Sequence, residues 1–214
     1  MEIVSLNKET YTRVLRQALR VLRAGGVIVY PTETAYGLGC DATNVAAVKR
    51  IFTIKGRSFK KPLPLIVGKR AMADRYVALS PALRLLARTY WPGALTVVAP
   101  MNTRNEIRKL SNWETVVSAK TGTVGIRVSA YPFARKLSEK LGKPIVATSA
   151  NYADGGECYT LIDVLKQLQS NVLPNLCIDG GHLRRRKPST IITVRDGHIV
   201  TLRQGAIAVR KLRY

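Results

Sequence analysis

Apolar stretches of strand length alternate with stretches of helical spacing along most of this 214-residue chain. In Thr10–Ala24, apolar residues recur every three to four positions, and Gly25-Gly26 ends the pattern. The four apolar residues Val27–Tyr30 follow directly as a strand. Such an alternation favours a mixed α/β fold with helices packed on a sheet. We expect a single domain over residues 1–214, built on an open, twisted mixed sheet flanked by helices.

The same alternation continues towards the end of the chain. Further helices are predicted after the capping residue Asn44, over Ser80–Tyr90, Pro132–Leu141 and Leu161–Gln169, and further strands over Leu63–Val67, Leu95–Ala99, Val124–Val128 and Pro144–Ala147. The polar stretch Asn102–Thr121 is predicted to be a long excursion. Two last strands, Thr190–Val194 and Ile199–Arg203, flank Asp196-Gly197, a dipeptide typical of a tight hairpin. The sheet is therefore not purely parallel.

The first strand runs into a small polar turn rich in glycine. It reads VIVYPTETAYGLGCDA from Val27 to Ala42. Binding residues are often found on loops that a rigid strand positions, so we expect this turn to face a ligand.

The balance of charge is the strongest global signal. Lys and Arg number 35 and Asp and Glu 13, which gives a formal charge of +22. Such a protein attracts polyanions, and nucleic acid and nucleotide phosphates are the natural candidates. The alternative is a generic basic surface without a specific partner. The run Leu183–Lys187 is correspondingly either a polyanion contact or a solvated loop.

Several classes of protein are disfavoured. The three cysteines are far apart and form no CxxC pair, which argues against a disulfide scaffold and a zinc site. No apolar run approaches the roughly 20 residues that span a bilayer, and Met1–Lys8 lacks a signal-peptide core. We expect a cytoplasmic protein with no membrane contact. The sequence also lacks a P-loop, a GxGxxG dinucleotide motif, a GxSxG elbow and an obvious acid/base couple of carboxylates.

Four cations stand within seven residues at Lys55, Arg57, Lys60 and Lys61. They repel one another unless an anion lies among them, and phosphate suits both Arg and Lys. The alternatives are a solvated face or cations that favour a helix C-terminus. We expect Lys55 to be an exposed loop cation.

Two further segments offer binding groups after or within apolar strands. Ser149 and Asn151 are short neutral hydrogen-bonding residues that suit phosphate or ribose, or that simply form a turn. Thr123 and Arg127 are an even number apart on one strand and share a face. A buried Arg127 needs an anionic partner, either carboxylate or phosphate. The combined pattern positions anions rather than supplying a strong base, which suits phosphoryl or nucleotidyl transfer.

Seven segments, in order, resemble the YrdC/Sua family of threonylcarbamoyl-AMP synthases in its short, single-domain form. They are GGVIVYPTETAYGLGCDA, VKRIFTIKGRSFKKPLPLIV, YWPGALTVV, VGIRV, PIVATSAN, PSTII and LRQGAI. The resemblance implies an open twisted α/β sheet with a basic concave face. It also implies a nucleotidyltransferase that makes threonylcarbamoyl-AMP and pyrophosphate from L-threonine, bicarbonate and ATP, with Mg²⁺ accompanying ATP. The product would feed threonylcarbamoyladenosine modification of tRNA through downstream proteins.

The resemblance also assigns site residues. The residues implied to bind ATP are Lys55, Arg57, Lys61, Thr123, Ser149, Asn151 and Arg203, and those implied to bind threonine are Thr34, Arg127, Ala147 and Ser189. Lys55 and Arg57 are implied to be catalytic, offsetting charge on the phosphates and the leaving pyrophosphate. No side chain is implied to bind metal, and no general base is assigned. The turn after the first strand would therefore face threonine.

Three departures from the family pattern stand in the sequence. Gly68 lies near the place where many relatives carry a threonine-contacting His, the Tyr152–Gly156 loop has one apparent insertion, and Cys158 lies where a Ser often meets ATP. Two other functions remain open: a non-catalytic RNA-binding protein of the same fold, and a carbamoyl transferase with a different acceptor. Retention of Lys55, Arg57 and Arg127 favours the enzyme.

Overall fold

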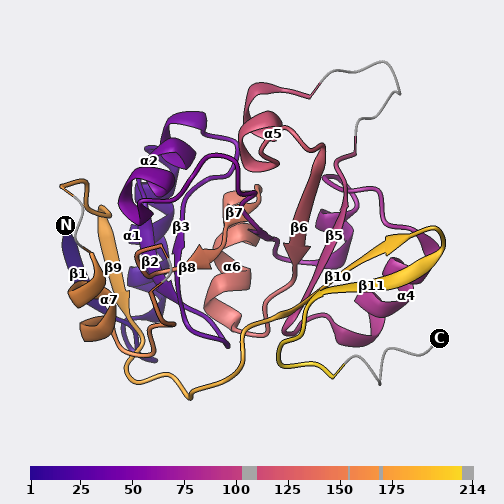
Figure 1. Ribbon diagram of the computed structural model, residues 1–214. Coiled ribbons are helices and arrows are strands. Elements are labelled where there is room, and N and C mark those ends of the chain that lie inside the picture. Colours follow the sequence, from indigo (N-terminus) through magenta and orange to yellow (C-terminus); the bar gives the residue numbers. More distant parts are fainter. Residues whose placement is uncertain (103–109, 154, 169–170, 209–214) are drawn as a thin grey trace.

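The strands of the protein form two mixed sheets that lie side by side, with helices packed against them (Figure 1). The computed structural model describes residues 1–102, 110–153, 155–168 and 171–208. The predicted mixed α/β fold is confirmed, although the strands divide into two hydrogen-bonded sheets rather than one. Within the described ranges, no helix is both long and apolar enough to cross a membrane.

In the part of the chain that the structure describes, the first sheet has five strands and the second has six. In spatial order, the first holds β1 (Glu2–Ser5), β9 (Leu176–Asp179), β2 (Ile28–Pro31), β3 (Tyr36–Gly39) and β8 (Thr148–Ser149). The second holds β11 (His198–Arg203), β10 (Thr190–Arg195), β5 (Leu95–Pro100), β6 (Thr123–Arg127), β4 (Leu65–Ile66) and β7 (Ile145–Val146). Both sheets contain parallel and antiparallel pairs, for example β2 parallel to β9 and antiparallel to β3.

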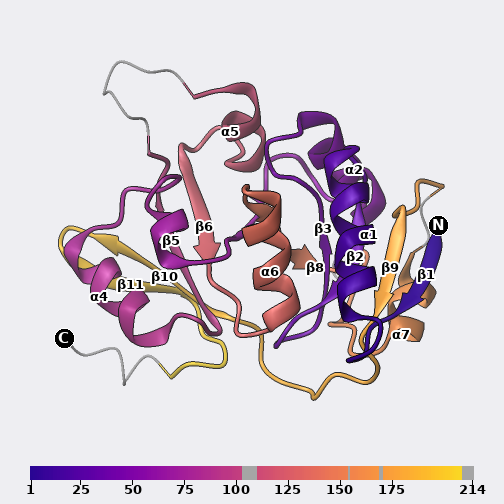
Figure 2. The same cartoon turned by 180° about the vertical axis from the view of Figure 1, so that it is seen from behind.

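The helices are α1 (Tyr11–Arg23), α2 (Val45–Lys55), α3 (Arg70–Ala73), α4 (Pro81–Tyr90), α5 (Asn112–Val117), α6 (Pro132–Leu141) and α7 (Leu161–Gln167). Helices α1 and α6 pack against each other and cover the outer face of the first sheet (Figure 2). Strand β2 shows why both of its faces are apolar. Ile28 and Tyr30 belong to the core cluster with α1 and α6, whereas Val29 belongs to the other core cluster with α2. Successive side chains of a strand point to opposite faces, so two covered faces require an unbroken apolar run.

The predicted caps and hairpin are confirmed. The Asn44 side chain accepts a hydrogen bond from the Ala47 N–H at 3.0 Å and so begins α2. The Ser80 hydroxyl accepts from the Leu83 N–H at the start of α4. Asp196 and Gly197 have φ values of 50° and 77°, as the two-residue turn between β10 and β11 requires.

Other elements were not predicted. Strands β1 and β9 and helix α3 were not expected from the sequence. Helix α5 lies in the stretch predicted to be a long excursion, and residues 103–109 of that stretch lie outside the described part. Gln169, the last residue of one predicted helix, also lies outside it. The glycines after the PTET turn belong to strand β3 rather than to the turn. A Cβ on Gly39 would stand 2.7 Å from the Tyr30 ring and 2.5 Å from the Val146 oxygen, so close packing explains glycine at this position.

Candidate functional site

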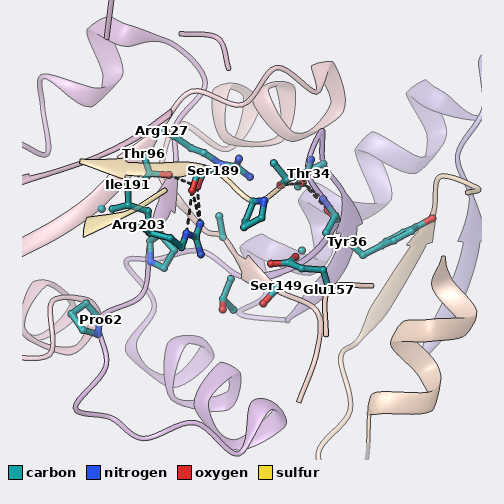
Figure 3. A pocket seen from close by; sticks show the side chains of 18 of the residues that line it. Thr34, Tyr36, Pro62, Thr96, Arg127, Ser149, Glu157, Ser189, Ile191 and Arg203 are labelled. Atoms are coloured by element: carbon teal, nitrogen blue, oxygen red, sulfur yellow. Dashed lines mark hydrogen bonds between the residues drawn. The ribbon is translucent and has the colours of Figure 1, made fainter. Parts of the chain in front are cut away.

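A cavity of about 350 Å³ opens between the two sheets (Figure 3). Strands β2, β3 and β8 supply one wall, and β5, β6, β10 and β11 supply the other. Thr34 and Tyr36 lie on one side of the view and Thr96, Ser189 and Arg203 on the other. A polar cleft of this kind, with convergent hydrogen-bonding groups, is the expected form of a small-molecule site.

The β2–β3 turn is organised by the hydroxyl of Thr32. It donates to the Ala35 carbonyl at 2.6 Å and accepts from the N–H groups of Thr34 and Ala35 at 3.2 and 3.3 Å. Its oxygen also lies 3.1 Å from the hydroxyl oxygen of Thr34. These contacts hold the turn in one conformation and place Thr34 in the lining of the cavity, as predicted for a residue facing a ligand.

Arg127, at the end of β6, has its anionic partner within the protein. Its Nη1 donates to Oε1 of Glu33 at 3.1 Å, and the side chains of Arg127 and Glu33 are only 9% and 8% exposed. The Ser129 hydroxyl donates to the other carboxylate oxygen. Burial raises the pKa of Glu33, but the Arg127 charge and hydrogen bonds from Ser129 and backbone N–H groups outweigh it, so that the pKa of Glu33 lies below its ordinary value. The expected carboxylate partner of Arg127 is thus present, and it is Glu33.

Ser189 joins three strands at the opposite wall. Its hydroxyl lies 2.8 Å from the Thr96 hydroxyl. Arg203 donates to the Ser189 carbonyl from Nε and Nη2 at 3.1 and 2.8 Å, and to the Ser189 hydroxyl at 3.1 Å. Arg203, assigned by resemblance to the nucleotide, therefore directly holds Ser189, assigned by resemblance to threonine.

Lys55 is not the exposed loop cation that the sequence predicted. It is the last residue of α2 and only 3% exposed, and its Nζ donates to the carbonyls of Ser149 and Asn151 at 2.6 and 2.8 Å. A third bond reaches Oδ1 of Asn151 at 2.9 Å. Burial, followed by the charge of Arg57, lowers the pKa of Lys55 to about 8. Lys55 lies beneath the Ser149–Asn151 segment and fixes its position.

Gly56 separates the directions of the two neighbouring cations. With φ of 58° it ends α2 in the left-handed conformation that glycine adopts easily. The chain turns there, so that Lys55 points inward while Arg57 lines the cavity. The Arg57 Nη2 donates to the Pro62 carbonyl at 3.0 Å. Lys60 and Lys61 are exposed and do not line the cavity, so the four cations diverge instead of forming one cluster.

The predicted site residues fall into two groups. Those that line the cavity are Thr34, Arg57, Arg127, Ala147, Ser149, Ser189 and Arg203, and those that do not are Lys55, Lys61, Thr123 and Asn151. Of the second group, Lys55 and Asn151 contact the lining residue Ser149 directly. Cys158 is buried and lies outside the lining.

Several residues of the site were not predicted from the sequence, and four of them bear on its chemistry. Thr32 and Thr96 line the cavity, Glu33 holds Arg127, and Glu157 also lines the cavity. Glu33 is part of the PTET turn that the sequence predicted to face a ligand, so its position in that turn was an available signal. Nothing in the sequence linked Thr96 to Ser189, since 93 positions separate them.

The cavity carries an excess of positive charge. Among the described residues, its lining holds three arginines (Arg57, Arg127 and Arg203) and one acidic side chain, Glu157. No group of three or more His, Cys, Asp or Glu residues in the described part could hold a metal ion. The arrangement can bind and orient anions next to a neutral hydrogen-bonding wall.

Comparison with known proteins adds independent findings. The sequence profile of a family designated Sua5_yciO_yrdC and described as "Telomere recombination" matches residues 20–205. The threonylcarbamoyl-AMP synthase of Vibrio vulnificus (strain YJ016) is 36% identical over 194 residues, which cover 89% of this chain and 98% of that protein.

Solved structures resemble the fold across nearly the whole chain. P. abyssi Sua5 complexed with L-threonine gives a TM-score of 0.83 at 31% identity, covering 99% of this chain and 59% of that one. This chain thus spans about three-fifths of the length of P. abyssi Sua5. E. coli YciO gives a TM-score of 0.79 at 27% identity, covering 99% and 98% of the two chains.

Proposed function

Because this chain belongs to the Sua5_yciO_yrdC family, we propose that it is a threonylcarbamoyl-AMP synthase, an enzyme that transfers an adenylyl group. The reaction would join L-threonine, bicarbonate and ATP to give threonylcarbamoyl-AMP and pyrophosphate. A cytoplasmic location is part of the same proposal, because the product would feed tRNA modification by downstream proteins.

One observation about the cavity carries the proposal: its cations stand in two different surroundings. Near the β2–β3 turn, Arg127 is paired with Glu33 and the pair is neutral overall; we call this part the amino-acid side. Arg57 and Arg203 line other parts of the cavity and Lys55 lies beneath it with neutral oxygen acceptors; we call this part the cationic side, although Arg203 and Arg127 belong to strands of the same wall. L-threonine is a zwitterion without net charge, whereas ATP is a polyanion. The two substrates match the two sides.

The roles of individual residues follow from this match. Arg127 would bind the threonine carboxylate through the part of its guanidinium that faces the cavity, with Thr34, Ala147 and Ser189 around the same substrate. Arg57, Ser149 and Arg203 would contact ATP directly. Lys55 would act through the backbone of Ser149 and Asn151, holding the segment that receives the nucleotide. Lys61 and Thr123 lie outside the cavity lining, so any contact with ATP would be at its outer edge.

The chemical step would begin with the amine of threonine, which takes up carbon dioxide or bicarbonate as a carbamate. A carbamate oxygen then attacks the α-phosphate of ATP, forming the new P–O bond, and pyrophosphate leaves with the electrons of the broken bond. The cationic side of the cavity offsets the charge that accumulates on the leaving group. Mg²⁺ bound to the ATP phosphates would neutralise part of the same charge.

The test is pyrophosphate release by the purified protein from ATP and bicarbonate, with and without L-threonine. We expect release that requires L-threonine and is weaker with L-serine. Release that is equal without an amino acid, or no release at all, would contradict the proposal.

A contact with RNA is a second candidate activity, favoured by one observation. Arg184, Arg185, Arg186 and Lys187 are all exposed and immediately precede Pro188 and Ser189, which line the cavity. Phosphate contacts of this kind give a binding constant that falls steeply with salt. Filter binding of tRNA at two salt concentrations, with these four residues changed to Ser, tests the contact; unchanged affinity would rule it out.

A further inference from the structure

Glu33 is the residue of the site that neither the sequence motifs nor the comparisons assign a role. Its side chain is 8% exposed and lies behind the cavity wall, outside the lining residues. Its carboxylate accepts hydrogen bonds from Arg127, from Ser129 and from backbone N–H groups including that of Ala130. So many donors hold the carboxylate ionised and fixed in place.

The contact with Arg127 uses only part of the guanidinium. Among the described residues, the guanidinium donates from Nη1 to Oε1 of Glu33. Arg127 itself lines the cavity. A guanidinium is planar and carries five N–H donors, so a carboxylate bound at one edge fixes the direction in which the remaining donors point. Glu33 therefore aims the free donors of Arg127 into the cavity.

The same contact changes the charge that a ligand meets. An Arg with no acidic partner would give this side of the cavity a charge of +1 and favour any anion. With Glu33 beside it the pair is neutral, and the negative charge behind the arginine also attracts a ligand ammonium group. Two other titratable groups interact with the pair. Burial is the main cause that raises the pKa of Tyr30, so its hydroxyl stays neutral at physiological pH. Burial is also the main cause that lowers the pKa of Arg203, to which the charge of Arg127 adds.

We propose that Glu33 is the specificity-determining residue of the amino-acid subsite: it positions Arg127 and neutralises it, so that the subsite accepts a zwitterionic amino acid in preference to a plain carboxylate anion. This inference rests on the proposed function, which places L-threonine next to Arg127. It adds the reason why the amino group of the ligand is required for binding as well as for chemistry.

The experiment compares two ligands that differ only in the group on the α-carbon, which is a charged ammonium in one and a neutral hydroxyl in the other. L-Threonine is one, and the other is 2,3-dihydroxybutyrate, which keeps the carboxylate and the β-hydroxyl but replaces the ammonium with a hydroxyl. Calorimetry gives the dissociation constant of each for the wild type, Glu33→Gln, Ser129→Ala and the control Glu9→Gln. Glu9 is exposed and outside the cavity lining, so its variant removes an equal charge elsewhere.

For Glu33→Gln we expect the ratio of the threonine constant to the dihydroxybutyrate constant to rise about tenfold, from loss of the ammonium attraction and gain of a net positive arginine. Ser129→Ala keeps the charge but loosens the carboxylate, so both ligands should weaken together, about threefold, with the ratio unchanged. Glu9→Gln should alter neither. ATP affinity should stay within twofold of wild type in all three.

Parallel weakening of both ligands in Glu33→Gln would show a merely structural residue and overturn the inference. If that variant does not fold, Ser129→Ala decides the positioning claim: unchanged binding of both ligands would overturn it. A wild type that binds no L-threonine would remove the proposed function and this inference with it. A wild type that binds threonine, with the same ratio in Glu33→Gln, would remove this inference alone.

Discussion

Lys55 and Arg127 are both buried cations beside one cavity, but the protein stabilises them in different ways. Arg127 meets a carboxylate, that of Glu33, at 3.1 Å. Lys55 meets two backbone carbonyls and an amide oxygen, all of them neutral, and its pKa is lowered to about 8 by burial and then by the charge of Arg57. One cation is compensated by a carboxylate in contact with it, and the other by contacting dipoles with a weaker electrostatic contribution from Glu157.

The difference indicates where an anionic ligand would bind. A buried charge without a contacting counter-charge is costly, and side chains with strongly shifted pKa values are concentrated at functional sites. The side with Lys55 keeps its positive potential for a ligand that brings several negative charges. The side with Arg127 has already neutralised its own, and suits a ligand without net charge.

The largest effect on turnover is expected from Lys55→Ala. This change removes the shared donor of three part-buried oxygens, of which Oδ1 of Asn151 keeps a hydrogen bond from the Ser149 hydroxyl; the free energy of unfolding should fall by about 2–4 kcal/mol. Turnover should fall by at least about 100-fold, because the Ser149–Asn151 segment loses its support. Urea denaturation and pyrophosphate release measure the two effects. The exposed Lys60→Ala is the matched control; stability equal to it in Lys55→Ala would show that the buried contacts are not made.

The second-largest effect is expected from Arg127→Ala, which should change the KM of one substrate much more than that of the other. The KM for L-threonine should rise by about 30-fold or more, since one partner of a buried, hydrogen-bonded charge pair is removed, while the KM for ATP changes little. The orphaned Glu33 carboxylate should also cost about 3–5 kcal/mol of stability. Adding Glu33→Gln to this variant should restore part of that stability. Equal increases in both KM values would contradict the separation of the two sides.

Arg203→Ala should affect the binding of both substrates rather than of one. Arg203 lines the cavity and also makes three hydrogen bonds to Ser189, so both substrates should be affected. We expect each KM to rise by about tenfold. Steady-state kinetics with each substrate varied in turn gives the answer. Thr96→Val, which removes only the hydroxyl contact to Ser189, should weaken threonine alone and by less.

The smallest expected effect is a dependence of ATP affinity on pH, which should arise from Lys55 on the cationic side of the cavity. The folded pKa of Lys55, about 8, is lower than its ordinary value of 10.5. The folded protein therefore loses this charge as pH rises through about 8, and ATP affinity should decline by several-fold between pH 7 and 9.5. The unfolded chain holds the proton up to a higher pH, so Lys55 by itself makes stability rise with pH between about 8 and 10.5. ATP titrations without threonine measure the decline; an affinity that is flat across this range would rule it out.

The contribution of Glu33 to stability should not change at alkaline pH. The pKa of Glu33 is lowered, so the stability that its ionised form contributes is present above its ordinary pKa and is lost only as pH falls through its still lower folded value. Thermal unfolding of wild type and Glu33→Gln from pH 3 to 7 should therefore converge only at the acidic end.

The sequence predicted the parts of the fold that depend on local chemistry. Helices α1, α4 and α6, the cap at Asn44 and the Asp196-Gly197 hairpin follow from spacing, capping and turn residues near one another in the chain. Strands β1 and β9 were missed because each has four residues and gains its place through pairing with the other, about 174 positions away. Short strands held by distant partners leave little local pattern.

The site divides in the same way. The need of Arg127 for an anion was visible from its apolar strand, but the identity of the partner was not, since Glu33 lies 94 positions earlier. Lys55 was predicted to be exposed because it ends a helix next to glycine. Its burial depends on the Ser149–Asn151 segment folding over it, again 94 to 96 positions away. The sequence indicated which residue types belong to the site, but which of them contact one another became clear only from the fold.

The order in which the chain enters the two sheets has a consequence for protein synthesis. Strand β9, at residues 176–179, is inserted between β1 and β2, and the chain then crosses to the second sheet, where Ser189 and Arg203 complete the cavity. Part of the wall that faces the PTET turn, from β5 and β6, is translated before the Ser149–Asn151 segment, whereas Ser189 and Arg203 follow it. A nascent chain that stalls before residue 189 would therefore carry the PTET turn, Lys55 and Arg127 but lack the lining residues Ser189 and Arg203, and with Arg203 one of the three arginines of the cavity.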